Sequence, residues 1–541
     1  MIINLRKYAL HLALAGVVVF ASCKKEPSPE PVNTDPPVTN PSGTRMQLTL
    51  DSIYLYAKEV YYWNDAIPAQ DVFNPRQYTT RSGDLNNFNA ELFAITQLKI
   101  NPETGKAYEY VEGENGMNAG YPKYSYIRDK ADENPTSATA SRSVSSVDLE
   151  GNGNDLGLAL SAIGTNSNFE VRIRYSSPGS PAEKAGLGRG DLINTFEGRT
   201  VGTDFQNEVG FINNAMAGST VKLAGRKKDG SAFNVTLTKA VYKSSPIYKD
   251  TILTSGSKKI GYLAYARFSN TTNSDAALKK TFADFAAGGV TDLIIDLRYN
   301  GGGYVHIAEL LSNLIAPSSL NGKVMFREKF NSTMQSGKAT ILKNQPLLDA
   351  NDKPQYEGGE LVTYFDIDYS EENNVHHFEK KGTLDGIQNV VFIVTGSTAS
   401  ASELVINNLK PHMNVKVVGK QSYGKPIGFF PITIQNKYDV YYSMFTSINS
   451  AGETDYYAGF VPDVDVADDV TRDFGDPAEL SLAAAIRQIP GTSTTIAATR
   501  ALSSLKIKGQ TVSSSAVKTR DVTPETDFTG MIESRFKRKK K

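Results

Sequence analysis

The chain has 541 residues, more than a single hydrophobic core usually organises, so two or three domains are expected. Hydrophobic residues make up 40% and charged residues 21% of the chain, the composition of a soluble globular protein. Its 58 basic residues are balanced by 58 acidic ones. This balance argues against nucleic acid or another polyanion as a partner, because such proteins need an excess of basic charge.

The first 23 residues have the pattern of a bacterial export signal. Two basic residues, Arg6 and Lys7, precede an apolar run that ends at Phe20 and is too short for a permanent membrane span. The letters FASC close this run at Cys23 and resemble the lipobox at which bacterial lipoproteins are cut and acylated, although Phe20 stands where Leu is usual. Cys23 is the only cysteine in the chain, so no intramolecular disulfide can form and lipidation is its expected role.

This N-terminus predicts a lipid-anchored protein in the cell envelope of a Gram-negative-type bacterium, facing the periplasm or the exterior. Lys24, directly after Cys23, favours the outer membrane. An ordinary signal peptide with an incidental cysteine is the alternative. Residues 24–45 are rich in proline and predict an extended spacer between membrane and folded protein.

A helical N-terminal domain is predicted over residues 46–142. Apolar residues recur at helical spacing between residues 46 and 68, and Asp51 is placed to cap a helix. Residues 73–139 are polar and rich in Asn, Asp and Gly, and predict no defined elements.

Residues 143–242 predict a β-rich domain of short strands separated by Gly and Pro. The segment 177–193, SPGSPAEKAGLGRGDLI, resembles the signature of bacterial PDZ domains. In that family a glycine flanked by apolar residues presents backbone N–H groups to the C-terminal carboxylate of a peptide, and Leu156, Gly157 and Leu158 stand where this loop should be. The alternative for these three residues is a simple turn at the start of a strand.

Strand-like and helix-like segments alternate over residues 243–490, which predicts an α/β core. A polar stretch at about 344–381 interrupts it and is interpreted as an insertion. Residues 491–541 are rich in Ser and Thr and end in RFKRKKK, which predicts a disordered basic tail.

Two turns of this core carry the candidate chemistry. Ser400 lies among small residues between a predicted strand and helix, where helix N–H groups favour developing negative charge. The next predicted strand leads to Lys425, so a strand–helix–strand unit brings both to one sheet edge. Apolar neighbours suit a lysine whose pKa must fall toward neutrality before it can act as a base. Lys420 is a weaker candidate.

The letters TASASE around Ser400, YGK ending at Lys425 and DLRYNGGG at 296–303 resemble the C-terminal processing (tail-specific) peptidase family. The resemblance implies N-terminal helices, a PDZ domain and an α/β core of the ClpP/crotonase type. It also implies a serine endopeptidase with Ser400 as nucleophile and Lys425 as general base, and an oxyanion hole formed by the backbone N–H groups of Gly302 and Ala401. Its substrates would be unfolded polypeptides with a free C-terminus, cleaved through an acyl-enzyme. One departure is Phe429, where many members have a Gln that helps to hold the lysine.

Several alternatives remain open. His306 could serve as the base, as a histidine does in tricorn-type proteases, and Glu403 could cap the helix after Ser400 instead of taking part in chemistry. The same core also occurs in retinoid-binding proteins, so a non-catalytic binder of peptides or apolar ligands is the second function. A third keeps hydrolysis but has a peptide linked to the cell wall as its substrate. No cofactor and no metal are expected, because no Cys/His cluster has metal-ligand spacing and no phosphate loop is present.

Overall fold

The computed structural model describes residues 42–113, 116–130, 147–349, 353–492, 504–507, 510–513, 518–523 and 530–539. The predicted export signal with Cys23 and nearly all of the predicted spacer lie outside these residues. Among the described residues, no helix is both long and apolar enough to cross a membrane.

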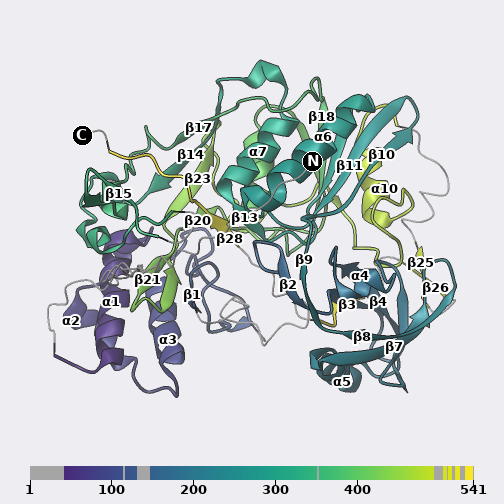
Figure 1. The fold of residues 1–541 in the computed structure, drawn as a ribbon, viewed down its shortest axis with the longest axis horizontal. Helices are drawn as coiled ribbons and strands as arrows, with labels where there is room; N and C mark the ends of the chain where they lie inside the picture. Colours follow the sequence, from purple (N-terminus) through teal and green to yellow (C-terminus); the bar gives the residue numbers. More distant parts are fainter. Residues whose placement is uncertain are drawn as a thin grey trace, which may run out of the picture.

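The N-terminal part is a small group of helices joined to the core by one strand (Figure 1). Helix α1 begins at Arg45, where the Thr44 hydroxyl accepts a hydrogen bond from Gln47 N–H, and it ends at Val60. Asp51, predicted as a cap, instead lies within α1 and forms an ion pair with Arg76. The other elements are α2 (Gln70–Phe73), α3 (Asp84–Thr96) and β1 (Tyr126–Asp129).

A second unit is built on a sheet with the strand order β27-β3-β4-β5-β7-β8, and β6 pairs with β5. Its buried face is lined by alternate apolar residues such as Leu160, Val171 and Leu223. The elements of this unit are β2 (Asn152–Asp155), β3 (Leu158–Gly164), β4 (Phe169–Ser176), α4 (Pro181–Lys184), β5 (Leu192–Phe196), β6 (Arg199–Thr200), α5 (Phe205–Ala217), β7 (Thr220–Arg226), β8 (Ala232–Thr238) and β9 (Ala240–Lys243).

The core is a six-stranded sheet with the order β10-β11-β12-β18-β19-β24, in which all neighbours are parallel except β10 and β11. Its central strands are fully buried runs of Val, Ile and Leu, as expected for a parallel sheet. The strands are β10 (Ile247–Ser255), β11 (Lys258–Tyr265), β12 (Asp292–Asp296), β18 (Asn389–Val394), β19 (Asn414–Gly419) and β24 (Val464–Asp465). The helices are α6 (Thr271–Ala287), α7 (Val305–Ile315), α9 (Ala401–Leu409) and α10 (Leu480–Arg487).

Shorter sheets surround the carboxyl ends of the core strands. Strand β1 of the N-terminal part pairs with β22, so this part is joined to the core by backbone hydrogen bonds. The strand orders are β1-β22-β21, β17-β14-β23-β20 and β13-β28. The elements are β13 (Gly302–Tyr304), β14 (Val324–Phe330), α8 (Ser332–Gln335), β17 (Val375–His377), β20 (Ile427–Gly428), β21 (Ile432–Ile434), β22 (Tyr438–Tyr441), β23 (Phe445–Asn449) and β28 (Gly530–Ile532).

The polar stretch at 344–381 contains a short hairpin, β15 (Tyr356–Glu357) and β16 (Glu360–Leu361), together with strand β17. It lies beside the end of the chain, because Ile367 forms a β-bridge with Arg538.

The prediction of a disordered tail after residue 490 was wrong for most of the described residues there. β25 (Ser504–Ile507) and β26 (Gln510–Ser513) form a hairpin, and β27 (Lys518–Asp521) adds antiparallel to β3. β28 crosses the centre of the molecule between β13 and β20, and the chain continues outward toward β15 (Figure 1). The basic composition is typical of disorder, but β27 and β28 gain backbone partners on distant strands that local composition does not reveal.

A buried ion network ties the core sheet to the segment before α10. Arg298, 2% exposed, pairs with Asp296 at 2.7 Å, with Asp468 at 2.6 Å and with Glu479 at 3.0 Å. Arg189 from the second unit also pairs with Asp468. The network therefore joins three distant parts of the sequence.

Replacing Arg298 by Met is expected to lower the free energy of unfolding by about 3–5 kcal/mol, because buried carboxylates lose their shared cation. Urea unfolding followed by circular dichroism measures this. Lys280→Met is the control, because it removes an exposed pair with Asp284 and should leave the unfolding curve almost unchanged. A loss for Arg298→Met as small as for the control would contradict the structural role of the network.

Candidate functional site

Ser400 lies in the turn between β18 and α9. Its backbone has φ 59° and ψ −111°, a conformation that is strained for a residue other than glycine and that is typical of functional turns. The side chain is fully buried, and its Oγ has no hydrogen-bond partner among the described residues. An unpartnered hydroxyl in a strained turn at a helix N-terminus has the features of a poised nucleophile.

The glycine-rich turn after β12 lies against this serine. A Cβ added to Gly302 would come within 3.0 Å of both Ala401 N and Ala399 O, so the two predicted oxyanion amides belong to neighbouring backbone segments. Ala401 is the first residue of α9, so its N–H has no acceptor within the helix. The N–H of Gly302 instead donates to Asn300 Oδ1 at 2.9 Å.

Lys425 is almost completely buried, and its ammonium group is held by a carbonyl and an aromatic ring. Nζ donates to Tyr124 O at 3.2 Å and lies 4.5 Å from the centre of the Phe429 ring. Burial lowers the pKa of Lys425 from 10.5 to about 7, against the opposing influence of Glu109 and Glu403. Phe429, which stands in place of the family's Gln, therefore contacts the lysine through its ring face.

One buried carboxylate connects the serine turn to the lysine turn. Glu403 Oε2 accepts hydrogen bonds from Ser400 N at 2.9 Å and from Lys425 N at 2.8 Å. Its Oε1 accepts from the Ser422 hydroxyl at 2.5 Å and from Gly424 N at 2.7 Å. Burial raises the pKa of Glu403 although these four donors lower it. Glu403 thus does bond the backbone of Ser400 as a capping residue does, and it also fixes the position of the lysine segment.

The sequence did not identify the group that holds the lysine. Tyr124 belongs to the polar stretch in which no elements were predicted, and its hydroxyl donates to Gly424 O at 2.7 Å. Its N–H donates to Glu109 Oε2 at 3.0 Å, so a second buried carboxylate orients this segment. Lys123 beside it has its pKa lowered by burial to about 8 and donates to Tyr457 O. No motif marks these residues, because their role depends on contacts across some 300 positions of sequence.

The other candidate bases are placed differently. The His306 ring lies between two hydroxyls, with Nε2 3.1 Å from Thr271 Oγ1 and Nδ1 3.4 Å from Ser534 Oγ. Burial, helped by Arg535, lowers the pKa of His306 to about 4. Lys420 is exposed and forms an ion pair with Asp465. Lys420 thus lacks the burial of Lys425, and the pKa of His306 lies well below neutrality.

The predicted carboxylate-binding loop lies in the second unit, at the start of β3. Gly157 has φ 71°, and an added Cβ would lie 2.0 Å from the Ser180 Cβ, so only glycine fits. Its N–H donates to Asp155 Oδ1 at 2.6 Å. Leu156 and Leu158 are fully buried on either side.

One group of potential metal ligands is present in the described part of the chain. It consists of Glu309, His376 and Glu533. Glu309 Oε1 already accepts from His376 Nδ1 at 2.6 Å and from the Arg535 guanidinium at 2.5 Å. Since an arginine occupies the carboxylate oxygen that a cation would need, this group is better described as an ion pair.

Comparison with known proteins places this site. Residues 259–466 match the model of Peptidase family S41, and this range contains both Ser400 and Lys425. These residues belong to peptidase family S41. The resemblance seen in the sequence motifs is therefore confirmed.

Curated relatives with similar sequences are named C-terminal processing proteases. The chain is 24% identical over 270 residues to the chloroplastic C-terminal processing peptidase of Tetradesmus obliquus, with 48% of each chain covered. It is 25% identical over 256 residues to the carboxy-terminal processing protease CtpA of Bacillus subtilis, covering 47% of this chain and 44% of that protein. The chain thus spans about half the length of the curated relatives it matches.

The fold is shared more widely than the sequence. A crystal structure from Bacteroides fragilis, of a protein assigned to the S41 proteases, superposes with a TM-score of 0.50 at 21% identity. The match covers 82% of this chain and 97% of that one. The mixed α/β architecture is therefore that of an S41 protein.

Proposed function

We propose that the chain is a serine endopeptidase in which Ser400 is the nucleophile and Lys425 the general base. The observation that carries the proposal is Glu403, which accepts hydrogen bonds from the backbones of both residues and so fixes two turns that lie 25 positions apart. Ser400 is strained and its hydroxyl has no described partner, while Lys425 has a pKa of about 7. Acyl transfer by a serine requires a nucleophile and a base whose pKa lies near the working pH.

The proposed reaction has two steps. Neutral Lys425 takes the Ser400 proton while Oγ attacks the substrate carbonyl, and the Ala401 N–H stabilises the oxyanion. Gly302 can add a second N–H only if that group leaves Asn300 Oδ1, to which it now donates. Collapse breaks the peptide bond, and Lys425 gives its proton to the leaving amine. Water, deprotonated by Lys425, then hydrolyses the acyl-enzyme and restores Ser400.

For residues 143–242 we propose a PDZ-type peptide-binding role that selects substrates by their free C-terminus. Support comes from the obligate glycine turn at Gly157 followed by strand β3. The Gly157 N–H would have to exchange Asp155 for the substrate carboxylate. An extended, unfolded substrate is required, because only a free chain can add as a strand.

We also propose that Cys23 carries a lipid anchor. Its test is membrane fractionation of the wild type and of Cys23→Ser. Anchoring predicts that the wild type sediments with membranes and that the variant becomes soluble; equal distribution would exclude the anchor.

The pH dependence of cleavage should report Lys425. Its folded-state pKa of about 7 means that the neutral, basic form predominates above this value. We therefore expect kcat/KM to rise with pH, to be half-maximal near 7 and to level off above it. Initial rates between about pH 5.5 and 9 give the profile. A plateau that persists to about pH 5 would instead match the pKa of His306 and would reject Lys425 as the base.

The test of the proposed function is cleavage of an unfolded reporter with a free apolar C-terminus. The same reporter with a C-terminal amide is the matched substrate, because it differs only in the carboxylate. We expect cleavage of the first, slower cleavage of the second, and retained cleavage of the first by His306→Ala. Binding of the reporter without cleavage would favour the non-catalytic alternative.

A further inference from the structure

The end of the chain lies beside the candidate nucleophile as an added strand. β28 pairs in parallel with β13, with Gly302 opposite Gly530 and Gly303 opposite Met531. On its other side the N–H of Phe429 donates to Met531 O at 3.0 Å. The segment thus fills a slot one strand wide between the oxyanion turn and the strand that follows Lys425, which is the binding mode expected for an extended peptide.

A carbonyl of this segment lies next to the predicted oxyanion amides. The point where Gly302 would carry a Cβ lies 2.3 Å from Gly530 O and 3.0 Å from Ala401 N. Gly530 N–H donates to Gly301 O at 3.0 Å, and this hydrogen bond fixes the register of β28 against the glycine-rich turn. The backbone around Gly530 therefore lies close to the predicted oxyanion turn.

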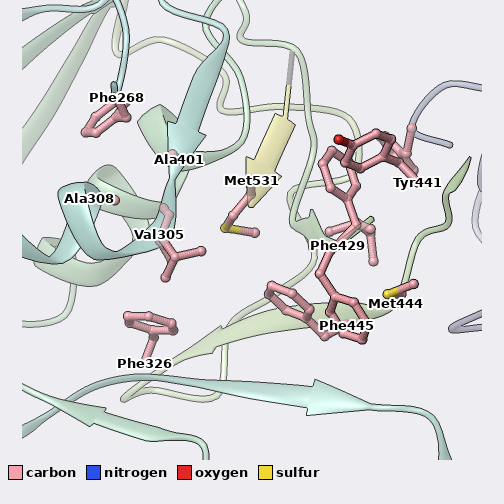
Figure 2. Close-up of a cluster of buried hydrophobic side chains, with 14 of the residues drawn as sticks. Phe268, Val305, Ala308, Phe326, Ala401, Phe429, Tyr441, Met444, Phe445 and Met531 are labelled. Atoms are coloured by element: carbon pink, nitrogen blue, oxygen red, sulfur yellow. The ribbon is translucent and has the colours of Figure 1, made fainter. Parts of the chain in front are cut away.

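The apolar side of the slot is filled by Met531, which is fully buried. Figure 2 shows its side chain between Val305 and Ala401 on one side and Phe429 on the other. The slot therefore selects an apolar side chain directly after a small residue.

Further along, the segment is held by charge and by aromatic contacts. Arg535 pairs with Glu309 at 2.5 Å, and the Phe536 ring meets the rings of Tyr364 and Phe430 edge-on, with centres 5.3 Å away in both cases. Arg538 pairs with Glu357 at 2.5 Å. Basic and aromatic side chains thus match the acidic and aromatic residues along this path.

We propose that residues 530–539 occupy the substrate cleft in cis and that the cleft selects peptides of the same class. That class has a small residue, then an apolar one, with an arginine four, an aromatic residue five and a second basic residue seven positions after the apolar one. The inference rests on the proposed peptidase function for its activity test.

The first test weakens the segment in the full chain. Arg535→Ala with Phe536→Ala removes one exposed and one half-buried side chain near the end of the chain, so the fold should be retained, which the melting temperature checks. A tethered segment acts at an effective concentration on the order of millimolar, so weakening it about tenfold should raise the cleavage rate about tenfold. Arg226→Ala removes an exposed side chain at the end of β7 in the second unit and is the control, which should leave the rate unchanged. An unchanged rate for the double variant would overturn the inference.

The second test needs no catalysis and therefore separates the two proposals. A peptide with the sequence of residues 530–539, labelled at its Lys539 end, is titrated into full-length Ser400→Ala with the native tail and with the weakened tail. We expect at least about tenfold tighter binding, by fluorescence anisotropy, to the weakened-tail chain, and no binding of a scrambled peptide. Equal affinities would overturn the inference even if the protein is a peptidase. If the weakened-tail chain binds the peptide more tightly, but the chain with Ser400 intact cleaves no reporter, the inference is supported and the proposed function is rejected.

Discussion

Ser400→Ala and Lys425→Met are each expected to reduce cleavage of an unfolded reporter by at least about 10³-fold. Alanine removes the atom that attacks the carbonyl, and methionine keeps the shape of lysine without its proton-accepting nitrogen. Because the two groups act as a unit, the double variant should be no slower than either single one. Initial rates measured with the weakened-tail chain as background give the largest signal.

The stability of the two variants provides the control. Burial lowers the folded-state pKa of Lys425 to about 7, so the buried lysine costs stability as pH falls from 10.5 toward 7, and the full cost is present below 7. Lys425→Met should therefore melt no lower than the wild type at pH 6, even though Tyr124 O loses a donor. A large fall in melting temperature would mean that lost activity reflects unfolding. Retained activity in either variant would contradict the Ser/Lys mechanism.

Glu403→Ala is expected to remove activity and to lower the free energy of unfolding by about 3–5 kcal/mol. Three backbone N–H groups and the Ser422 hydroxyl would lose their acceptor inside the protein, and each unsatisfied buried donor costs about 1–3 kcal/mol before the site relaxes. The turns of Ser400 and Lys425 would also lose the group that fixes their relative position. Urea unfolding and reporter cleavage measure the two effects.

Glu403→Gln separates the structural role of Glu403 from a role of its charge. Its amide oxygen can accept at one side of the site, but its NH₂ group faces donors at the other. We expect intermediate stability and activity lowered about 10- to 100-fold through misplacement of the lysine. The half-maximal pH of cleavage by Glu403→Gln should be lower than that of the wild type, because Glu403 raises the pKa of Lys425. Wild-type activity in Glu403→Ala would exclude the positioning role.

Much of the candidate site could be read from local sequence. Fully apolar strands ending in glycine-rich or small-residue turns predict a parallel sheet with functional residues at one edge, and the structure has β12 and β18 ending in this way. The family resemblance implied that Gly302 and Ala401 lie together, and they are adjacent. Such features depend on neighbours within a few residues, so a single sequence can reveal them.

Tertiary structure alone decided how the lysine is held and what fills the cleft. Tyr124 supplies a carbonyl from a stretch without pattern, and backbone carbonyls leave no signature in a sequence. The basic end of the chain has the composition of a disordered tail, but it gains strand partners on β13 and a carboxylate at Glu309. The sequence therefore determined the candidate reacting groups and the sheet that presents them. Long-range packing determined their surroundings, because burial and backbone pairing between distant segments depend on the whole fold.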